Sequence, residues 1–418
     1  MSPLSAEALA FEWERRAVRR AGSVAGMSLG LAFCLGPSGA GAQDVGLSGY
    51  YLNVATRAGS VLGQGDGFSD FQRLRLMWSG GPSPFHVDLA YEHTLTARQA
   101  GAQGAQLFTA AGVVGGGDWL DLGGELERTE RAQWRHRLDQ LALQVDLGES
   151  ADLVMGRQTI SWATTLVMTP GDPFSPFDPA DPFREYRRGV DAVRIRYYRG
   201  PFTQLEAVVR PATFGGATKV TALARAVTNR GGWDVSAWAG SLHGQAAAAL
   251  SASGGLGLWA LRVEAVAQDA GEDAVFRGTV GLDRTFGLAG RDAVLVFEYQ
   301  RDGLAAASAD GYGALLTSPA LGRGELQVLG RHELVSQASL QLHPLLGADL
   351  LGLVNLVDGS VLLGPGVGYS ASHSLSLRLG AFYGLGDGAA VTPGGQVELG
   401  SEYGATPLVV FLSLSAFF

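Results

Sequence analysis

Short segments in which apolar side chains alternate with polar or small ones, each of roughly ten residues, recur along most of the chain. Leu74 and Leu76, for example, alternate with Arg73 and Arg75. The same alternation occurs over 193–197, 261–265 and 374–379. A period of two residues is the signature of a β-strand whose two faces meet different surroundings.

Composition limits the folds that this pattern can build. The chain has 418 residues and a net charge of −9, and 17% of its residues are charged, against about 25% in typical soluble domains. It contains no uninterrupted apolar run of about 18 residues, which excludes a protein that crosses a membrane with several helices. The negative charge argues against nucleic acid as a partner. A glycine-rich soluble β-protein and a transmembrane β-barrel remain.

The N-terminus predicts export. A charged leader with four arginines is followed by an apolar run over 21–35 and by the small residues Ala40-Gly41-Ala42. This order is typical of a secretory signal peptide, here 1–42, which is removed from the mature chain. The only cysteine, Cys34, lies inside the signal, so disulfides, thiolate metal sites and cysteine nucleophiles are not expected in 43–418.

The connections between the predicted strands favour the barrel over a soluble sandwich. Short connections lie at 79–84, 147–150, 199–202, 228–232 and 343–347, and long ones at 95–132, 161–187, 302–330 and 385–404. Short periplasmic turns that alternate with long outer loops are typical of outer-membrane barrels. Aromatic residues near the strand ends, such as Trp78 and Trp259, fit the girdles at the two membrane interfaces.

The chain ends in a predicted strand whose last residue is Phe418. Val410, Leu412 and Leu414 share one face of this strand with Phe418. The pattern resembles the C-terminal signal read by the outer-membrane assembly machinery, although Ala416 stands where an aromatic residue is more usual. We therefore expect Phe418 to act as an assembly signal.

Eighteen candidate strands run from 45–55 to 405–418. The weakest, 244–252, is alanine-rich, and we retain it because an even count places both termini on the periplasmic side. The expected fold is all-β, a transmembrane antiparallel up-and-down β-barrel of about 18 strands, formed by 43–418 in the cell outer membrane of a Gram-negative bacterium. A barrel of this size leaves an aqueous channel.

The connection 161–187 is the most informative stretch for function. Its prolines disfavour sheet pairing, and its three phenylalanines require burial. Its candidate charged residues are Asp172, Asp178, Asp181, Arg184, Glu185 and Arg187, together with Arg188, which directly follows the connection. The arrangement resembles general porins, in which the third loop folds inward and narrows the pore.

The expected inward-facing wall residues are mostly arginines. The basic candidates are Arg73, Arg75, Arg194, Arg196, Arg210, Arg262, Arg277 and Arg378, and the acidic ones are Glu206, Glu264, Asp283 and Glu298. One hypothesis is that loop carboxylates face wall arginines and select solutes by charge. The alternative is that these charges pair with each other and keep a wide lumen hydrated.

Two short motifs flank the constriction loop. Gly156-Arg157-Gln158 ends one predicted strand, and Arg187-Arg188-Gly189-Val190-Asp191 begins the next. They resemble the alginate-export and related outer-membrane channel families, and the resemblance implies a barrel of similar strand number with an arginine-rich pore. The proline-rich run 172–179 is absent from the alginate-export pattern, so an anionic polysaccharide substrate does not follow.

The predicted function is a porin-like channel for passive, charge-filtered diffusion of small polar solutes. The alternatives are an export channel for an anionic polysaccharide or other secreted molecule, and a structural sheath around a partner. The seven histidines form no H-E-x-x-H motif, and we expect no enzyme activity, metal or cofactor. The expected partners are outer-membrane lipid, lipopolysaccharide and the assembly machinery, and a homo-oligomer remains open.

Overall fold

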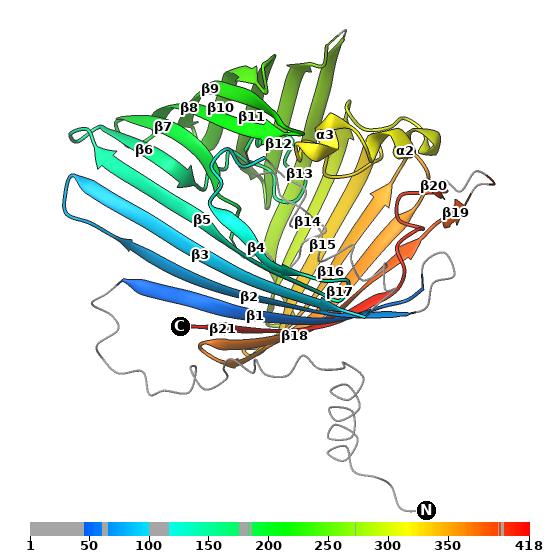
Figure 1. Ribbon diagram of the computed structural model, residues 1–418. Coiled ribbons are helices and arrows are strands. Elements are labelled where there is room, and N and C mark those ends of the chain that lie inside the picture. The colour runs from blue at the N-terminus through cyan, green and yellow to red at the C-terminus, as the bar shows by residue number, and fades with distance from the viewer. Residues whose placement is uncertain are drawn as a thin grey trace, which may run out of the picture. The chain divides into compact units, whose positions relative to one another are not determined.

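The computed structural model describes residues 46–60, 66–99, 117–174, 183, 186–271, 273–391, 393 and 397–418. The predicted signal peptide, 1–42, lies outside these residues. The described chain is dominated by antiparallel strands in one large sheet (Figure 1). None of the helices in the described part is long and apolar enough to span a membrane.

Eighteen strands close into a barrel in chain order. Each pairs with its neighbours antiparallel, and the last strand pairs with the first, Tyr50 opposite Phe417. The strands are β1 (Leu47–Ala58), β2 (Gly67–Gly80), β3 (Phe85–Arg98), β5 (Ala132–Asp146), β6 (Ala151–Gln158), β7 (Val190–Arg199), β8 (Thr203–Phe214), β9 (Ala217–Arg230), β10 (Trp233–Leu242), β11 (Gln245–Leu256), β12 (Trp259–Asp269), β13 (Ala274–Leu288), β14 (Arg291–Asp302), β15 (His332–His343), β16 (Leu346–Asn355), β17 (Val361–Ser372), β18 (Leu375–Leu385) and β21 (Val409–Phe417). The predicted barrel class and strand number are confirmed.

The alanine-rich stretch predicted with least support is a full barrel strand. β11 pairs with β10 and β12 along its length, Ala249 opposite Trp238 and Val266. Alanine has a high helix propensity, but propensity is worth less than about 1 kcal/mol per residue, and the backbone bonds offered by two neighbouring strands outweigh it.

Several short elements in the connections were not predicted. β4 (Gly123–Arg128) pairs with one half of β5, and β19 (Ala389–Val391) forms a small hairpin with β20 (Val397–Leu399). The connection between β14 and β15 carries η4 (Ala309–Gly311), α2 (Tyr312–Leu315) and α3 (Pro319–Gly322).

The two ends of the barrel differ as the sequence predicts. At one end, here the short-turn end, successive strands are joined by tight turns, such as Gly231–Gly232 between β9 and β10. Both glycines have positive φ, 64° and 81°, which side chains disfavour. The other end, the long-loop end, carries the connections 99–131, 159–189, 303–331 and 386–408.

The barrel is apolar outside and polar inside. Leu250, Val280 and Leu379 point outward and are 65%, 48% and 56% exposed, whereas inward residues such as Arg75 and Glu264 are buried. An exposed apolar belt on a closed sheet is stable in hydrocarbon, because every strand backbone group is paired within the wall.

We expect Val280→Arg to reduce the free energy of unfolding in lipid vesicles by about 2–4 kcal/mol, because a charge then faces the middle of the bilayer. Urea titration of vesicle-inserted protein measures this change. Leu258→Arg, in the exposed turn between β11 and β12, is the matched control and should unfold like the wild type. Equal effects of both variants would contradict a lipid-facing β13.

Candidate functional site

The chain turns into the barrel where β6 ends. Residues 159–174, here called the inner segment, follow Gln158 and carry three almost completely buried side chains, Ile160, Trp162 and Met168. The segment contains no strand, so its buried backbone N–H groups need partners elsewhere. The barrel wall supplies them.

Glu264 of β12 accepts hydrogen bonds from three backbone N–H groups of the inner segment. The donors are Thr164, Thr165 at 2.9 Å and Gly171 at 2.7 Å. A Cβ atom on Gly171 would lie 2.7 Å from Glu264 Oε2, so a larger residue there would displace the carboxylate. Glycine at 171 therefore allows one carboxylate to hold both arms of a bend.

Glu298 of β14 holds the next residues in the same way. Its carboxylate accepts from Leu166 N at 2.6 Å, Val167 N at 3.1 and 3.2 Å, and Met168 N at 2.7 Å. Gln327, in the connection between β14 and β15, accepts from Thr169 N at 2.7 Å and donates to Val167 O at 3.0 Å. Bonds from amides to carboxylates are stronger than neutral ones, so these contacts fix the segment's path.

Donors on the wall complete the attachment. Arg262 Nη1 donates to Thr164 O at 3.2 Å, Trp238 Nε1 to Gly171 O at 2.9 Å and Arg210 Nη1 to Phe174 O at 3.4 Å. Both the N–H and the C=O groups of the inner segment are thus bound by inward-facing side chains.

Apolar contacts show that the inner segment crosses the lumen. Trp162 and Phe174 pack edge to face, 4.8 Å between ring centroids, in a cluster formed with β7–β12. Val167 and Met168 belong to a second cluster formed with β1, β15–β18 and β21. Phe183 joins this second cluster, where its ring lies 4.8 Å from that of Phe411. One connection therefore contacts opposite sides of the barrel.

The predicted charges of the connection divide into described and undescribed residues. Asp178, Asp181, Arg184 and Glu185 lie outside the described residues. Asp172 accepts hydrogen bonds from Ser161 Oγ at 2.8 Å and Arg187 Nη1 at 2.7 Å, and Arg188 forms an ion pair with Asp118 at 2.7 Å. The sequence did not predict that two wall acids, Glu264 and Glu298, bind the backbone of the inner segment, and the expected pairing of loop carboxylates with wall arginines stays a prediction.

Most of the predicted wall arginines form ion pairs with wall carboxylates. The pairs are Arg75–Glu92 (2.5 Å), Arg75–Asp139 (2.6 Å), Arg194–Glu206, Arg196–Asp152 (2.7 Å), Arg262–Asp283 (2.6 Å), Arg277–Asp302 (2.8 Å) and Arg378–Asp349 (2.6 Å). Sequence reasoning missed five of these acids as inward residues: Glu92, Asp139, Asp152, Asp302 and Asp349. Their alternation with outward apolar residues was the available signal.

Three inward arginines have other surroundings. Arg73 lies 5.0 Å from the Phe71 ring and donates to Phe183 O at 3.4 Å. Arg225, which was not predicted, lies 5.4 Å from the Trp162 ring and donates to Ser236 Oγ at 3.3 Å. Within the described chain no carboxylate forms an ion pair with Arg210 or Arg225, so β8 and β9 present positive charge toward the inner segment.

Exposure of the ion pairs differs between the two halves of the barrel. Arg378 and Asp349, near the short-turn end, have side chains 36% and 22% exposed. Arg277 and Asp302, near the long-loop end, are 4% and 1% exposed. Arg378–Asp349 and Arg262–Asp283, toward the short-turn end, are therefore accessible to solvent, whereas Arg277–Asp302 at the other end is covered.

A hydrogen-bonded group at the long-loop end joins three connections, and we call it the outer latch: Tyr312, Asn355, Asp358 and Glu402. Glu402 accepts from Leu329 N at 2.6 Å, Gly330 N at 3.0 Å and Asn355 Nδ2 at 2.7 Å. Its own N–H and the Tyr312 hydroxyl donate to Asp358, at 2.8 and 2.7 Å. Tyr403, the next residue, donates its hydroxyl to Glu333 of β15.

The outer latch is connected to the inner segment through a few residues. Gln327, which binds Thr169 and Val167, lies two residues before Leu329, which Glu402 binds. Desolvation of the Glu402 carboxyl raises its pKa to about 7, although the N–H groups of Leu329 and Gly330 act in the opposite direction. Proximity of Asp358 contributes to this rise in the pKa of Glu402.

This fold is that of outer-membrane porins. OccAB1 of Acinetobacter baumannii is similar at 10% identity and a TM-score of 0.55 over 90% of this chain and 97% of that one. A BenF-like porin of Pseudomonas fluorescens Pf-5 is similar at 13% identity and 0.55, and the outer membrane protein opdK of Pseudomonas aeruginosa at 12% and 0.51, each over 90% of this chain and 99% of the other. No family model and no curated protein sequence matches the chain.

We expect replacement of both clamping carboxylates, Glu264→Gln with Glu298→Gln, to release the inner segment. An amide offers one acceptor oxygen and no charge, and each weakened bond to a charged group costs about 1.5–3 kcal/mol. Hydrogen exchange of residues 164–171 should accelerate by more than tenfold. Asp349→Asn, which alters a wall ion pair away from the segment, is the control, and equal exchange in both variants would argue against the clamp.

Alkaline pH is expected to loosen the outer latch. The folded pKa of Glu402, about 7, lies above the ordinary glutamate value of about 4.3. The stability that the protonated Glu402 carboxyl gives to the outer latch is therefore fully present at acid pH. It is lost as the pH rises through 7. After correction for the intrinsic pH dependence of exchange, residues 326–330 should exchange about thirtyfold faster at pH 8.5 than at pH 5.5.

The variant Glu402→Gln carries a neutral side chain at every pH and should weaken this dependence. Glu398→Gln, an exposed residue of the same connection, should keep it. A wild-type exchange rate that, so corrected, does not change between pH 5.5 and 8.5 would contradict the role assigned to Glu402.

Proposed function

We propose that this chain is an outer-membrane channel for passive, charge-filtered diffusion of small polar solutes, with the long-loop end outside the cell. The observation that carries the proposal is the inner segment, which crosses the lumen and is held by Glu264 and Glu298. The porin fold and the outward apolar belt support a location in the outer membrane.

In this proposal the inner segment restricts solutes by size. It carries apolar side chains on both sides of the lumen and leaves less room between them than an empty barrel of this strand number. Asp172, Arg187 and Arg188 then belong to the constriction, together with Asp178, Asp181, Arg184 and Glu185.

Charge acts at two positions along the path. Hydrated ion pairs in the short-turn half, such as Arg378–Asp349, replace part of a solute's water shell and lower the cost of entry. Arg210 and Arg225 bias the field near the constriction. Because most other wall arginines are paired, the lumen lacks the uniformly positive surface expected for export of an anionic polymer.

The termini fit the same orientation. β1 begins and β21 ends at the short-turn end, which the proposal places on the periplasmic side. We also propose that Phe418, directly after β21, serves as the assembly signal, because it continues the apolar face that includes Val410 and Leu412.

The first test is the conductance of refolded 43–418 in planar bilayers under asymmetric salt. Discrete steps with weak selectivity are expected. Strong anion preference would favour export of an acidic polymer, and silence from a folded barrel would contradict the channel and favour a sheath.

Deletion of 161–182, which removes the residues that Glu264 and Glu298 clamp, tests the constriction. Single-channel conductance should rise at least about twofold, because the barrel is then limited by its wall. Arg291→Gln changes an exposed outward charge at the short-turn end and should conduct like the wild type. Unchanged conductance in a deletion variant that still migrates as a folded barrel would exclude the inner segment as the constriction.

A further inference from the structure

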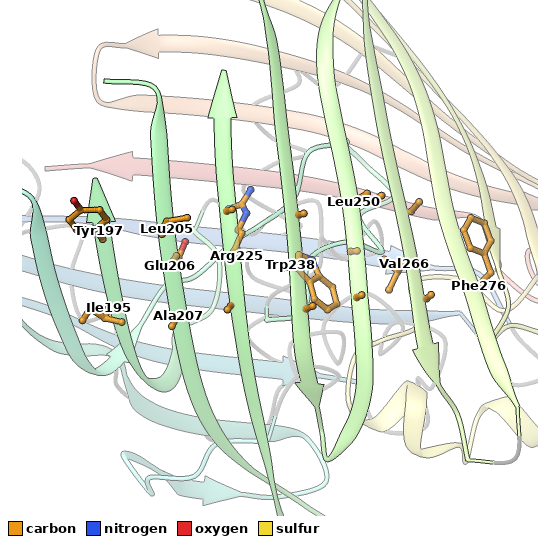
Figure 2. Close-up of a pocket in the computed structure, with 18 residues that line it drawn as sticks. Ile195, Tyr197, Leu205, Glu206, Ala207, Arg225, Trp238, Leu250, Val266 and Phe276 are labelled. Atoms are coloured by element: carbon orange, nitrogen blue, oxygen red, sulfur yellow. The ribbon is translucent and has the colours of Figure 1, made fainter. Parts of the chain in front are cut away.

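The outward face of β7–β13 is hollowed because its side chains are small (Figure 2). Strand register aligns two rows of outward residues across these strands. The first row is Ile195, Ala207, Ala224, Ala239, Ala248, Ala267 and Phe276, and the second is Tyr197, Leu205, Ala226, Ala237, Leu250, Ala265 and Gly278. All of these residues except Gly278 line a groove of about 950 Å³, here called the alanine groove.

The alanine groove runs obliquely across the outer surface of the wall, from near the short-turn end of β7 toward the long-loop end of β13. Tyr197 lies two residues from the short-turn end of β7, whereas Gly278 lies near the long-loop end of β13. In the next strand, Arg301 stands directly opposite Gly278 and one residue before the end of β14. The second row therefore ends at an arginine at the long-loop end.

Arg301 is a cation on the membrane-facing side of the wall. Its guanidinium lies 5.9 Å from the Phe276 ring and donates to Phe276 O at 3.0 Å. Across the sheet it faces His332, and its sequence neighbour Asp302 is engaged by Arg277 on the inner face. Among the described residues no carboxylate forms an ion pair with Arg301, so the charge is available to an anion from outside.

We propose that the alanine groove binds one phosphorylated lipid of the outer leaflet, lipopolysaccharide, with a lipid A phosphate on Arg301 and an acyl chain in the part of the groove nearer the long-loop end. The inference rests on the proposed orientation in the outer membrane. A phosphate matches the planar donors of a guanidinium at headgroup depth. A flexible acyl chain can follow a groove that is one side chain deep. A second barrel does not fit into it, because the outer wall of a barrel is convex.

The geometry explains the position of each part. A charge on the lipid-facing surface is tolerated near the interface and costs more toward the bilayer centre, which fits Arg301 at the strand end. On the membrane side of Arg301, alanines on five adjacent strands leave a space that a hydrocarbon chain fills. Each methylene group of such a chain gains about as much free energy from contact with this apolar surface as a methylene group buried in a protein core.

The test measures lipid A retained by the full-length protein after mild detergent extraction from outer membranes and gel filtration. The wild type should retain about one lipid A per barrel, as a groove of this size and one cationic site imply. The filled variant Ala224→Phe with Ala239→Phe, and separately Arg301→Gln, should each lower retention about tenfold. Ala381→Phe, an outward alanine of β18 away from the groove, is the matched control and should retain wild-type lipid.

The outcomes separate this inference from the channel proposal. Single-channel conductance should be unchanged in all four proteins, because these side chains face away from the lumen. Three results would each overturn the lipid site. They are a filled variant that retains as much lipid as the wild type, a wild type that carries no lipid, and a variant that loses an oligomeric state but keeps its lipid. Heat-modifiable migration of every variant confirms that the barrel is folded before lipid is counted.

Discussion

The interior of this barrel depends on how a stretch of chain without sheet pairing satisfies its backbone amides. Barrel strands bond to their neighbours, but residues 164–171 cross the lumen with no strand beside them. Glu264 and Glu298 provide the acceptors, and the low dielectric around them strengthens each bond. If these two acids were apolar, the buried N–H groups would be unsatisfied, and the segment would have no fixed path.

The wall arginines have a different role from Glu264 and Glu298, which bind the inner segment. Arg75, Arg196 and Arg277 each meet at least one wall carboxylate, so they stabilise the wall and line it with dipoles more than they create a net positive field. The exposed pairs lie in the half of the barrel that the inner segment leaves open. Of the two hypotheses that the sequence left open, mutual pairing describes most of the wall arginines, whereas charge selection by loop carboxylates that face them stays a prediction.

The strands were predictable because a period of two residues determines which side chains share a face, and a barrel has only two faces. Contacts across the lumen were not predictable in this way. Glu298 was placed inward from the alternation in β14, yet nothing local indicates that it binds Met168, 130 residues earlier. The outer latch escaped prediction for the same reason, since Glu402 and Leu329 lie in irregular connections whose proximity is set by the closed barrel. β4 was not predicted because its first two residues, Gly123 and Gly124, are typical of loops.

The sequence distances in the clamp also constrain the order of folding. Thr165 and Glu264 are separated by 99 residues, and Leu166 and Glu298 by 132. Closing such long loops is entropically costly until the intervening strands have already paired. We therefore expect the inner segment to dock late, after the wall has formed at least through β14, so that the earlier strands pair without a segment held between them.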